Sequence, residues 1–186
     1  MARIPVPTRD SVPQDQLDAF DEYVASRGSI PTAGPMSVML NVPEVLKRGE
    51  HLRAYLRGDG SSLPRPIIEL AMLVTARENN CQFIWNAHAA AGRAAGLNDD
   101  LVNNLRDRKD LPALSPQEQA VVEYGREFFR TRTVSQATFD AALAQFGTRG
   151  LAELTTLMGY YALLAFNINA FGVEIPEDRT EEALPV

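Results

Sequence analysis

The sequence is poor in several residue types on which catalytic and metal sites often depend. Its 186 residues include one cysteine, Cys81, one tryptophan, Trp85, and two histidines, His51 and His88. A single cysteine cannot form a disulfide within the chain, which is consistent with a reducing compartment and favours a cytoplasmic location. Two histidines without an HxxxH motif or a cluster of carboxylates argue against a metal site.

Three further absences narrow the class of protein. Acidic residues outnumber basic ones by 24 to 18, and the net charge of −6 argues against binding to nucleic acid phosphates. The N-terminus lacks the apolar segment of a signal peptide, and the apolar run 154–171 contains threonine and asparagine without flanking basic clusters. No strand-like alternation, phosphate-binding glycine loop or internal repeat is found. We therefore expect a soluble all-α protein that binds neither nucleic acid nor membrane.

The spacing of apolar residues predicts seven or eight helices arranged around a central helical hairpin. We divide the chain into an N-terminal arm and helix (residues 1–33), a helical domain (34–173) and a polar C-terminal tail (174–186) that is expected to fray. Ser115-Pro116-Gln117-Glu118 has the pattern of a helix start. Ser135 is expected to cap a helix that ends at Gly147, and the last helix follows to about Phe171.

The central hairpin spans residues 63–97 and breaks near Glu78-Asn79-Asn80. Its first helix is apolar around much of its circumference, and Ser61 or Ser62 is expected to cap it. Glu69 lies within this apolar run. Burying a carboxylate without a partner costs several kcal/mol or raises its pKa by about 3–5 units. Glu69 is therefore expected to have a partner.

The second helix of the hairpin contains the residues with the most reactive side chains. Asn79 or Asn80 is expected to cap it, which places Cys81 in or beside the first turn. Free backbone N–H groups and the helix dipole at that position favour a thiolate. Trp85 and His88 follow at i+4 and i+7, so the three side chains lie on roughly one face.

A motif formed by Glu69, Cys81 and His88 resembles that of the carboxymuconolactone decarboxylase and AhpD-like family. In that family a glutamate lies twelve residues before the first cysteine of a CxxC pair, and a histidine lies four residues after the second cysteine. Ile84 stands where the second cysteine would be. The resemblance covers roughly residues 34–171 and includes the LPRPIIEL segment and Trp85. It implies an AhpD-like all-α fold and a homo-oligomer, a trimer or hexamer, with the site near a subunit interface.

The resemblance also implies a function. Without the second cysteine a dithiol cycle is chemically impossible, so the chain is closer to the decarboxylase branch, which needs no cofactor. The implied substrate is a small anionic lactone of the 4-carboxymuconolactone type, from aromatic catabolism. In this interpretation His88 transfers a proton and Glu69 orients it. Residues expected to contact the substrate are Arg65, Arg77 or Arg93 for its carboxylate, and Ile84 and Trp85 as pocket walls.

Two alternatives remain open at this point. Cys81 could act as a single-cysteine thiol peroxidase, forming a sulfenic acid that an external thiol resolves. The chain could instead be a catalytically silent helical protein that binds a ligand or partner. His51 has no chemical partners nearby in the sequence, and we expect no role for it.

Overall fold

The computed structural model describes residues 2–186, which form eight α-helices, two short 3-10 helices and no strand. The all-α class and the expected number of helices are confirmed. The helices are α1 (Leu17–Arg27), α2 (Gly34–Met39), α3 (Pro43–Arg57), α4 (Arg65–Glu78), α5 (Gln82–Ala94), α6 (Asp99–Asp107), α7 (Pro116–Thr131) and α8 (Gln136–Phe171), with 3-10 turns at Arg9–Ser11 and Gln14–Gln16.

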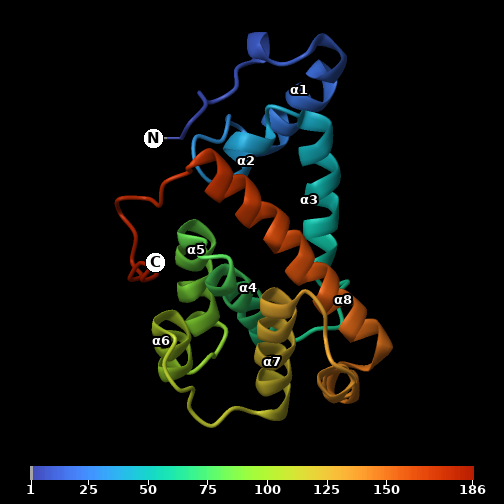
Figure 1. The fold of residues 1–186 in the computed structure, drawn as a ribbon. Helices are drawn as coiled ribbons and strands as arrows, with labels where there is room; N and C mark the ends of the chain where they lie inside the picture. The colour runs from blue at the N-terminus through green and yellow to red at the C-terminus, as the bar shows by residue number, and fades with distance from the viewer. Residues whose placement is uncertain (1) are drawn as a thin grey trace.

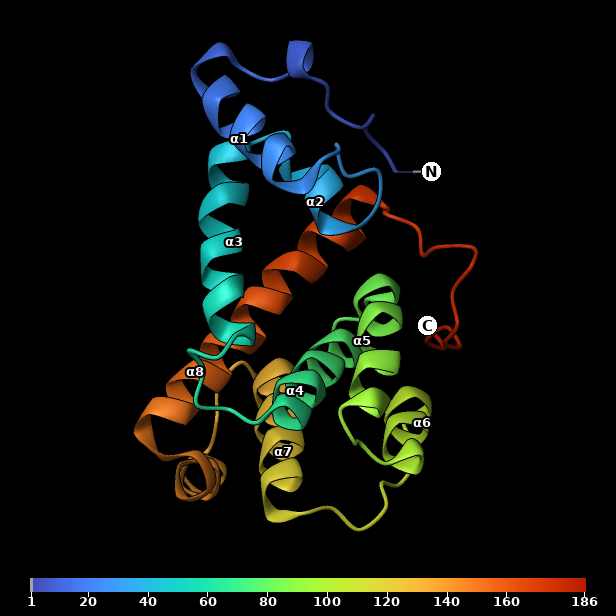
Figure 2. The ribbon, with the colours of Figure 1, turned by 180° about the vertical axis from the view of Figure 1, so that it is seen from behind.

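Helix α4 is the centre of the molecule. Every residue from Ile67 to Arg77 is buried, which is why its apolar residues surround the helix instead of forming one stripe. Helices α5, α7 and α8 pack around it (Figure 1), and the opposite view shows α4 between α5 and α7 (Figure 2). Gly125 allows α7 to approach closely, because a Cβ there would lie 2.7 Å from Val74.

Helix α8 crosses the molecule and bends sharply at Gly147, whose φ of 64° and ψ of 177° are essentially restricted to glycine. This confirms that the helix beginning after Ser135 stops at Gly147. The second part of α8 packs against α2, α3, α4 and α7. By length and composition α8 could cross a membrane, but 56% of its apolar window is buried in the fold. More than half of this window therefore packs inside the fold.

The predicted helix caps are correct for α7 and α8 but wrong for α4. Ser115 and Glu118 form a reciprocal capping box, and the Ser135 side chain accepts a hydrogen bond from Thr138 N. Helix α4 instead begins after Pro64 without a side-chain cap. Ser61 and Ser62 both donate hydrogen bonds to Glu153 of α8. The Glu153 carboxylate of α8 thus binds the two hydroxyls that were candidates to cap α4.

The C-terminal tail does not fray, contrary to expectation. Leu184 is only 3% exposed, and its backbone N–H donates to Gln82 Oε1 over 3.1 Å. Both terminal nitrogens of Arg77 donate to Pro185 O, each at 3.1 Å. The Leu184 side chain and the buried Arg77 guanidinium therefore hold the otherwise polar C-terminal tail beside α5. Figure 1 shows the C-terminus at this place.

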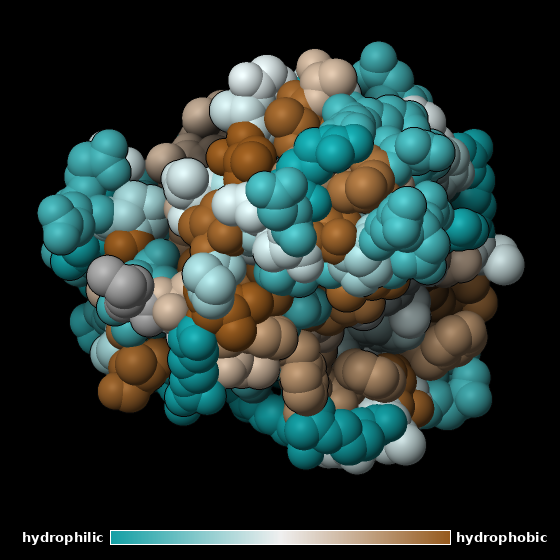
Figure 3. Space-filling model, turned by 90° about the horizontal axis from the view of Figure 1, so that it is seen from above, coloured by the Kyte–Doolittle hydropathy of each residue, from teal (hydrophilic) through white to brown (hydrophobic). Residues whose placement is uncertain are grey.

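The N-terminal arm packs on its own chain. Arg3 N donates to Phe171 O over 2.8 Å, so the arm lies against the end of α8. Figure 3 views this end of the molecule from above, where hydrophobic residues lie between hydrophilic ones.

Candidate functional site

Glu69 of α4 and His88 of α5 form a buried hydrogen-bonded pair. His88 Nδ1 lies 2.8 Å from Glu69 Oε2, and Glu69 is completely buried. The two helices can approach because α5 has glycine at position 92, where a Cβ would lie 3.0 Å from Leu97, 3.3 Å from Leu73 and 3.7 Å from Glu69 Cβ. The structure thus brings together the carboxylate and the imidazole that the sequence spacing singled out.

The surroundings of His88 set its protonation state. Burial lowers the pKa of His88 below its usual value of 6.5, and the hydrogen bond with Glu69 offsets only part of that effect. His88 is therefore neutral near pH 7. Because a carboxylate can only accept, Nδ1 carries the proton and Nε2 holds a free electron pair. The pair is arranged for proton transfer at Nε2.

Two arginines flank the Glu69 carboxylate. Arg65, one turn earlier on α4, places Nη2 2.5 Å from Oε1, and Arg57 at the end of α3 places Nη2 3.8 Å from the same oxygen. The Arg65 side chain is 48% exposed and that of Arg57 is 23% exposed. Arg65 was one of the three arginines predicted to contact the substrate carboxylate. Arg57 was not predicted as a site residue, because it approaches Glu69 only through the turn between α3 and α4.

Tyr161 of α8 is a second residue that sequence reasoning missed. Its ring packs edge-on against His88, with ring centroids 5.2 Å apart at an angle of 79°. Burial raises the pKa of Tyr161, and nearby Arg57 and Arg53 counteract this in part. Tyr161 therefore covers one side of the imidazole as a neutral phenol. No sequence pattern indicated Tyr161 as a site residue, since α8 is far from the motif in the chain.

Cys81 lies at the start of α5, as expected, but it is not a thiolate. Cys81 is itself the N-cap residue, while Asn79 ends α4, so the expected asparagine cap is wrong. Burial raises the pKa of Cys81 to about 11 despite backbone hydrogen bonds from Ile84 and Phe83. The prediction that the helix dipole favours a thiolate fails, because the cost of removing the charge from water is larger.

The other predicted site residues have different surroundings. Ile84 and Trp85 are 3% and 1% exposed and belong to the hydrophobic core, so their contact with a substrate stays a prediction. Arg77 donates to Pro185 O and Arg106 O, and Arg93 pairs with Asp99 and Glu181. Neither Arg77 nor Arg93 contacts the Glu69–His88 pair. The structure therefore does not bring them to this pair, and their contact with a substrate carboxylate stays a prediction.

Two asparagines near the end of α8 bind backbone carbonyls outside the Glu69–His88 pair. The Asn167 side chain donates to Leu163 O within the helix, and that of Asn169 donates to Asn79 O. The latter contact helps to fix the turn between α4 and α5.

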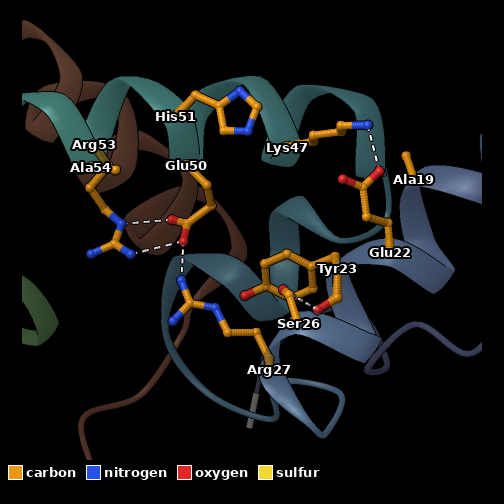
Figure 4. A pocket seen from close by; sticks show the side chains of 10 residues that line it. All are labelled: Ala19, Glu22, Tyr23, Ser26, Arg27, Lys47, Glu50, His51, Arg53 and Ala54. Atoms are coloured by element: carbon orange, nitrogen blue, oxygen red, sulfur yellow. Dashed lines mark hydrogen bonds and ion pairs between the residues drawn. The ribbon is translucent and has the colours of Figure 1, made fainter.

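A separate cavity of about 390 Å³ lies between α1 and α3 (Figure 4). Most of its charged residues pair with one another: Glu50 binds Arg27 and Arg53, and Lys47 binds Glu22. His51 lines this cavity but is exposed and is not part of the pair at α4 and α5. Within residues 2–186, no group of three or more histidine, cysteine or carboxylate side chains is placed to hold a metal ion.

Comparison with known families agrees with this site. The model of the Carboxymuconolactone decarboxylase family matches residues 43–127. This segment, which runs from α3 into α7, is similar to that family and contains Arg57, Arg65, Glu69, Cys81 and His88. The resemblance seen in the sequence motif is thereby confirmed. None of the curated proteins compared with the chain matches it.

Solved structures show the same fold at low sequence identity. A peroxidase-related protein with an alkylhydroperoxidase AhpD core from Ralstonia eutropha JMP134 aligns with a TM-score of 0.71 at 17% identity, over 95% of this chain and 93% of its own. A peroxidase-related protein from Silicibacter sp. TM1040 gives 0.72 at 17%, over 97% and 95%. A protein of unknown function from Agrobacterium tumefaciens, described as a candidate antioxidant defence protein AhpD, gives 0.67 at 20%, over 75% and 96%. The fold is therefore AhpD-like.

Proposed function

We propose that the protein is a cofactor-independent decarboxylase that acts on a small anionic lactone through proton transfer at His88. One observation supports this most strongly: the 2.8 Å hydrogen bond that fixes His88 against a fully buried carboxylate. Such a pair orients an imidazole and sets its protonation, as general acid–base catalysis requires.

The chemistry can be written with groups at this site. The bond between the ring carbon and its carboxylate breaks, and CO₂ leaves. The electron pair of that bond spreads through the unsaturated ring to the carbonyl oxygen of the lactone, which gives a dienolate. On substrate binding, His88 Nε2 takes up a proton from solvent and the ring becomes an imidazolium. A carbon–hydrogen bond then forms with this Nε2 proton, which leaves His88 neutral again. The negative charge of the bound substrate favours the imidazolium that makes this donation. Glu69 stabilises that imidazolium through Nδ1.

The charge balance of the site suits an anionic substrate. With His88 neutral, Arg57 and Arg65 carry two positive charges against the single negative charge of Glu69. Arg65 is half exposed, so it can meet a substrate carboxylate where the site opens to solvent.

Turnover of 4-carboxymuconolactone tests the proposal directly. We expect the purified protein to change the ultraviolet absorbance of the lactone, and His88→Ala and Glu69→Gln to lower kcat by about 100-fold or more. His51→Ala, which removes the histidine outside the site, should leave the rate unchanged. Absence of turnover, or full turnover by His88→Ala, would remove the assignment.

A single-cysteine peroxidase is the second candidate, because the Ralstonia and Silicibacter neighbours are described as peroxidase-related. The complete burial of Cys81 and its pKa of about 11 weigh against it. Peroxide consumption that disappears in Cys81→Ser but survives in His88→Ala would favour this candidate. If neither substitution alters either activity, the remaining alternative is a silent helical binding protein.

A further inference from the structure

Arg57 has hydrogen-bonding capacity that the folded chain does not use. Its Nε is buried, and no acceptor for it exists among residues 2–186. A buried donor without a partner costs about 1–3 kcal/mol. The Nε atoms of Arg77 and Arg126 are also buried without a partner, but only Arg57 of these three arginines lies beside the Glu69–His88 pair. The nearest anionic atom, Glu69 Oε1, lies 3.8 Å from Arg57 Nη2, which is beyond hydrogen-bond distance.

Glu69 does not need Arg57 as a partner. His88 is hydrogen-bonded to Oε2, and the Arg65 guanidinium forms an ion pair with Oε1 at 2.5 Å, although Oε1 itself accepts no hydrogen bond. Arg57 therefore supplies a positive charge in excess of what the carboxylate requires. It lies beside Tyr161, whose ring packs on His88, so its free N–H belongs to the same cluster as the proton-transferring imidazole.

The chemistry of decarboxylation indicates which substrate atom Arg57 should meet. An arginine bound to the departing carboxylate would stabilise the negative charge on that group in the ground state. It would therefore oppose the reaction, in which this charge moves away from the carboxylate. The charge moves to the lactone oxygen, and a donor fixed there in a buried environment stabilises the transition state more than the ground state. Arg57 is the more buried of the two arginines, and Arg65 is nearer to solvent.

We infer that Arg57 binds the lactone oxygen on which negative charge develops, while Arg65 binds a carboxylate that stays on the molecule. The inference rests on the proposed decarboxylation.

The kinetics of two arginine variants separate these roles. Arg57→Gln is expected to lower kcat by about 100-fold, as loss of an oxyanion donor does, with little change in KM. Arg65→Gln should mainly raise KM. Arg48→Gln is the matched control, because Arg48 lies on the same helix, is 79% exposed and pairs with Glu44. An unchanged kcat in Arg57→Gln would overturn the inference while the proposed function stands.

A binding measurement tests Arg57 without turnover. Tetronate is a five-membered lactone whose negative charge is delocalised over its oxygens, so it imitates the dienolate. By isothermal titration calorimetry we expect the wild-type protein and Arg48→Gln to bind tetronate, and Arg57→Gln to bind it at least about tenfold more weakly. Equal affinity in Arg57→Gln, or no binding by the wild type, would overturn the role of Arg57.

The two experiments distinguish failure of the inference from failure of the proposed function. Tetronate binding that depends on Arg57, without any turnover of the lactone, would retain the anion site and reject the decarboxylase. Thermal unfolding checks that each variant is folded. Arg57→Lys keeps the charge but lacks the planar fork, and it is expected to lose part of both kcat and tetronate affinity. If Arg57→Gln does not fold, the same criteria apply to Arg57→Lys.

Discussion

The charge of His88 depends on its surroundings, and this makes folding stability depend on pH. Its pKa in the folded protein lies below its usual 6.5. As pH falls below 6.5, the unfolded chain takes up a proton at His88 before the folded protein does. The contribution of His88 to stability is therefore fully present above pH 6.5 and is lost as pH falls through the folded pKa.

We expect His88→Gln to remove this part of the pH dependence. The free energy of unfolding of the wild-type protein, from urea titrations between pH 5 and 8, should decrease towards acid more steeply than that of His88→Gln. His51→Gln, which removes an exposed histidine, serves as the control. Parallel curves for the wild type and His88→Gln would show that burial of the imidazole does not shift its titration.

The residues of the site differ in how far sequence reasoning could find them. Glu69 and His88 were found because both belong to one helical hairpin, where chain spacing fixes which side chains can meet. Arg57 and Tyr161 come from α3 and α8, and their approach depends on how separate helices pack. The state of Cys81 was misjudged because its burial results from tertiary packing, which local helix rules do not describe.

At the scale of helices, Gly147 allows the bend in α8. Its φ of 64° with ψ of 177° strains any residue that carries a Cβ, although a Cβ there would meet nothing within 4 Å. Gly147→Ala should therefore destabilise the protein by about 1–3 kcal/mol through backbone strain alone.

Chemical denaturation measures this cost against a matched control. A Cβ at Gly159, in the straight part of α8, would also meet nothing within 4 Å. Gly159→Ala is expected to stabilise by about 0.5–1 kcal/mol, because alanine favours helix. If both substitutions change stability in the same direction, the bend is not a source of strain.

Glu153 joins α8 to the loop between α3 and α4. Its carboxylate accepts hydrogen bonds from Tyr55, Ser61, Ser62 and Arg149. Burial alone would raise the pKa of Glu153, but hydrogen bonds from Ser62, Arg149 and Tyr55 lower it to about 2. The stability that depends on this carboxylate is present above its usual pKa of 4.5 and is lost as pH falls towards 2.

We expect Glu153→Gln to lower the free energy of unfolding at pH 7 by about 2 kcal/mol, a value reduced for the solvent exposure of Arg149. The difference from wild type should shrink below pH 4. Glu177→Gln, at an exposed position, provides the control. A loss that stays constant down to pH 2 would contradict the assigned pKa.

At the scale of the whole molecule, the C-terminal tail contributes to the stability of the core. Removal of residues 179–186 would uncover the surface beneath Leu184 and leave Arg77 without the Pro185 carbonyl. Together these losses should cost about 2–4 kcal/mol. Thermal unfolding of the truncated chain measures the effect, and Leu184→Ala should reproduce part of it. An unchanged melting temperature would mean that the tail only rests on the surface.

The homo-oligomer stays a prediction at this scale. Leu163 and Phe166 of α8 are 44% and 74% exposed, which is unusual for apolar side chains on the core helix. We expect a trimer or hexamer in analytical ultracentrifugation and a shift towards smaller species in Phe166→Glu. A wild-type protein that sediments as a monomer would contradict the expectation.

The helices could be predicted from the sequence because apolar spacing and capping residues are local signals, as Ser115 and Ser135 show. The tail could not, because its composition is polar and its placement depends on one leucine and on Arg77 from a distant helix. Rules based on the composition of a segment do not detect such single tertiary contacts.

The single buried thiol makes the chain its own reporter of opening motions. Because Cys81 is fully enclosed at the junction of α4 and α5, a small alkylating reagent can reach it only when that junction separates. The labelling rate under native conditions therefore measures how often the hairpin that holds Glu69 and His88 opens. No engineered probe is required, and the rate can be followed by intact-protein mass spectrometry while ligands are added.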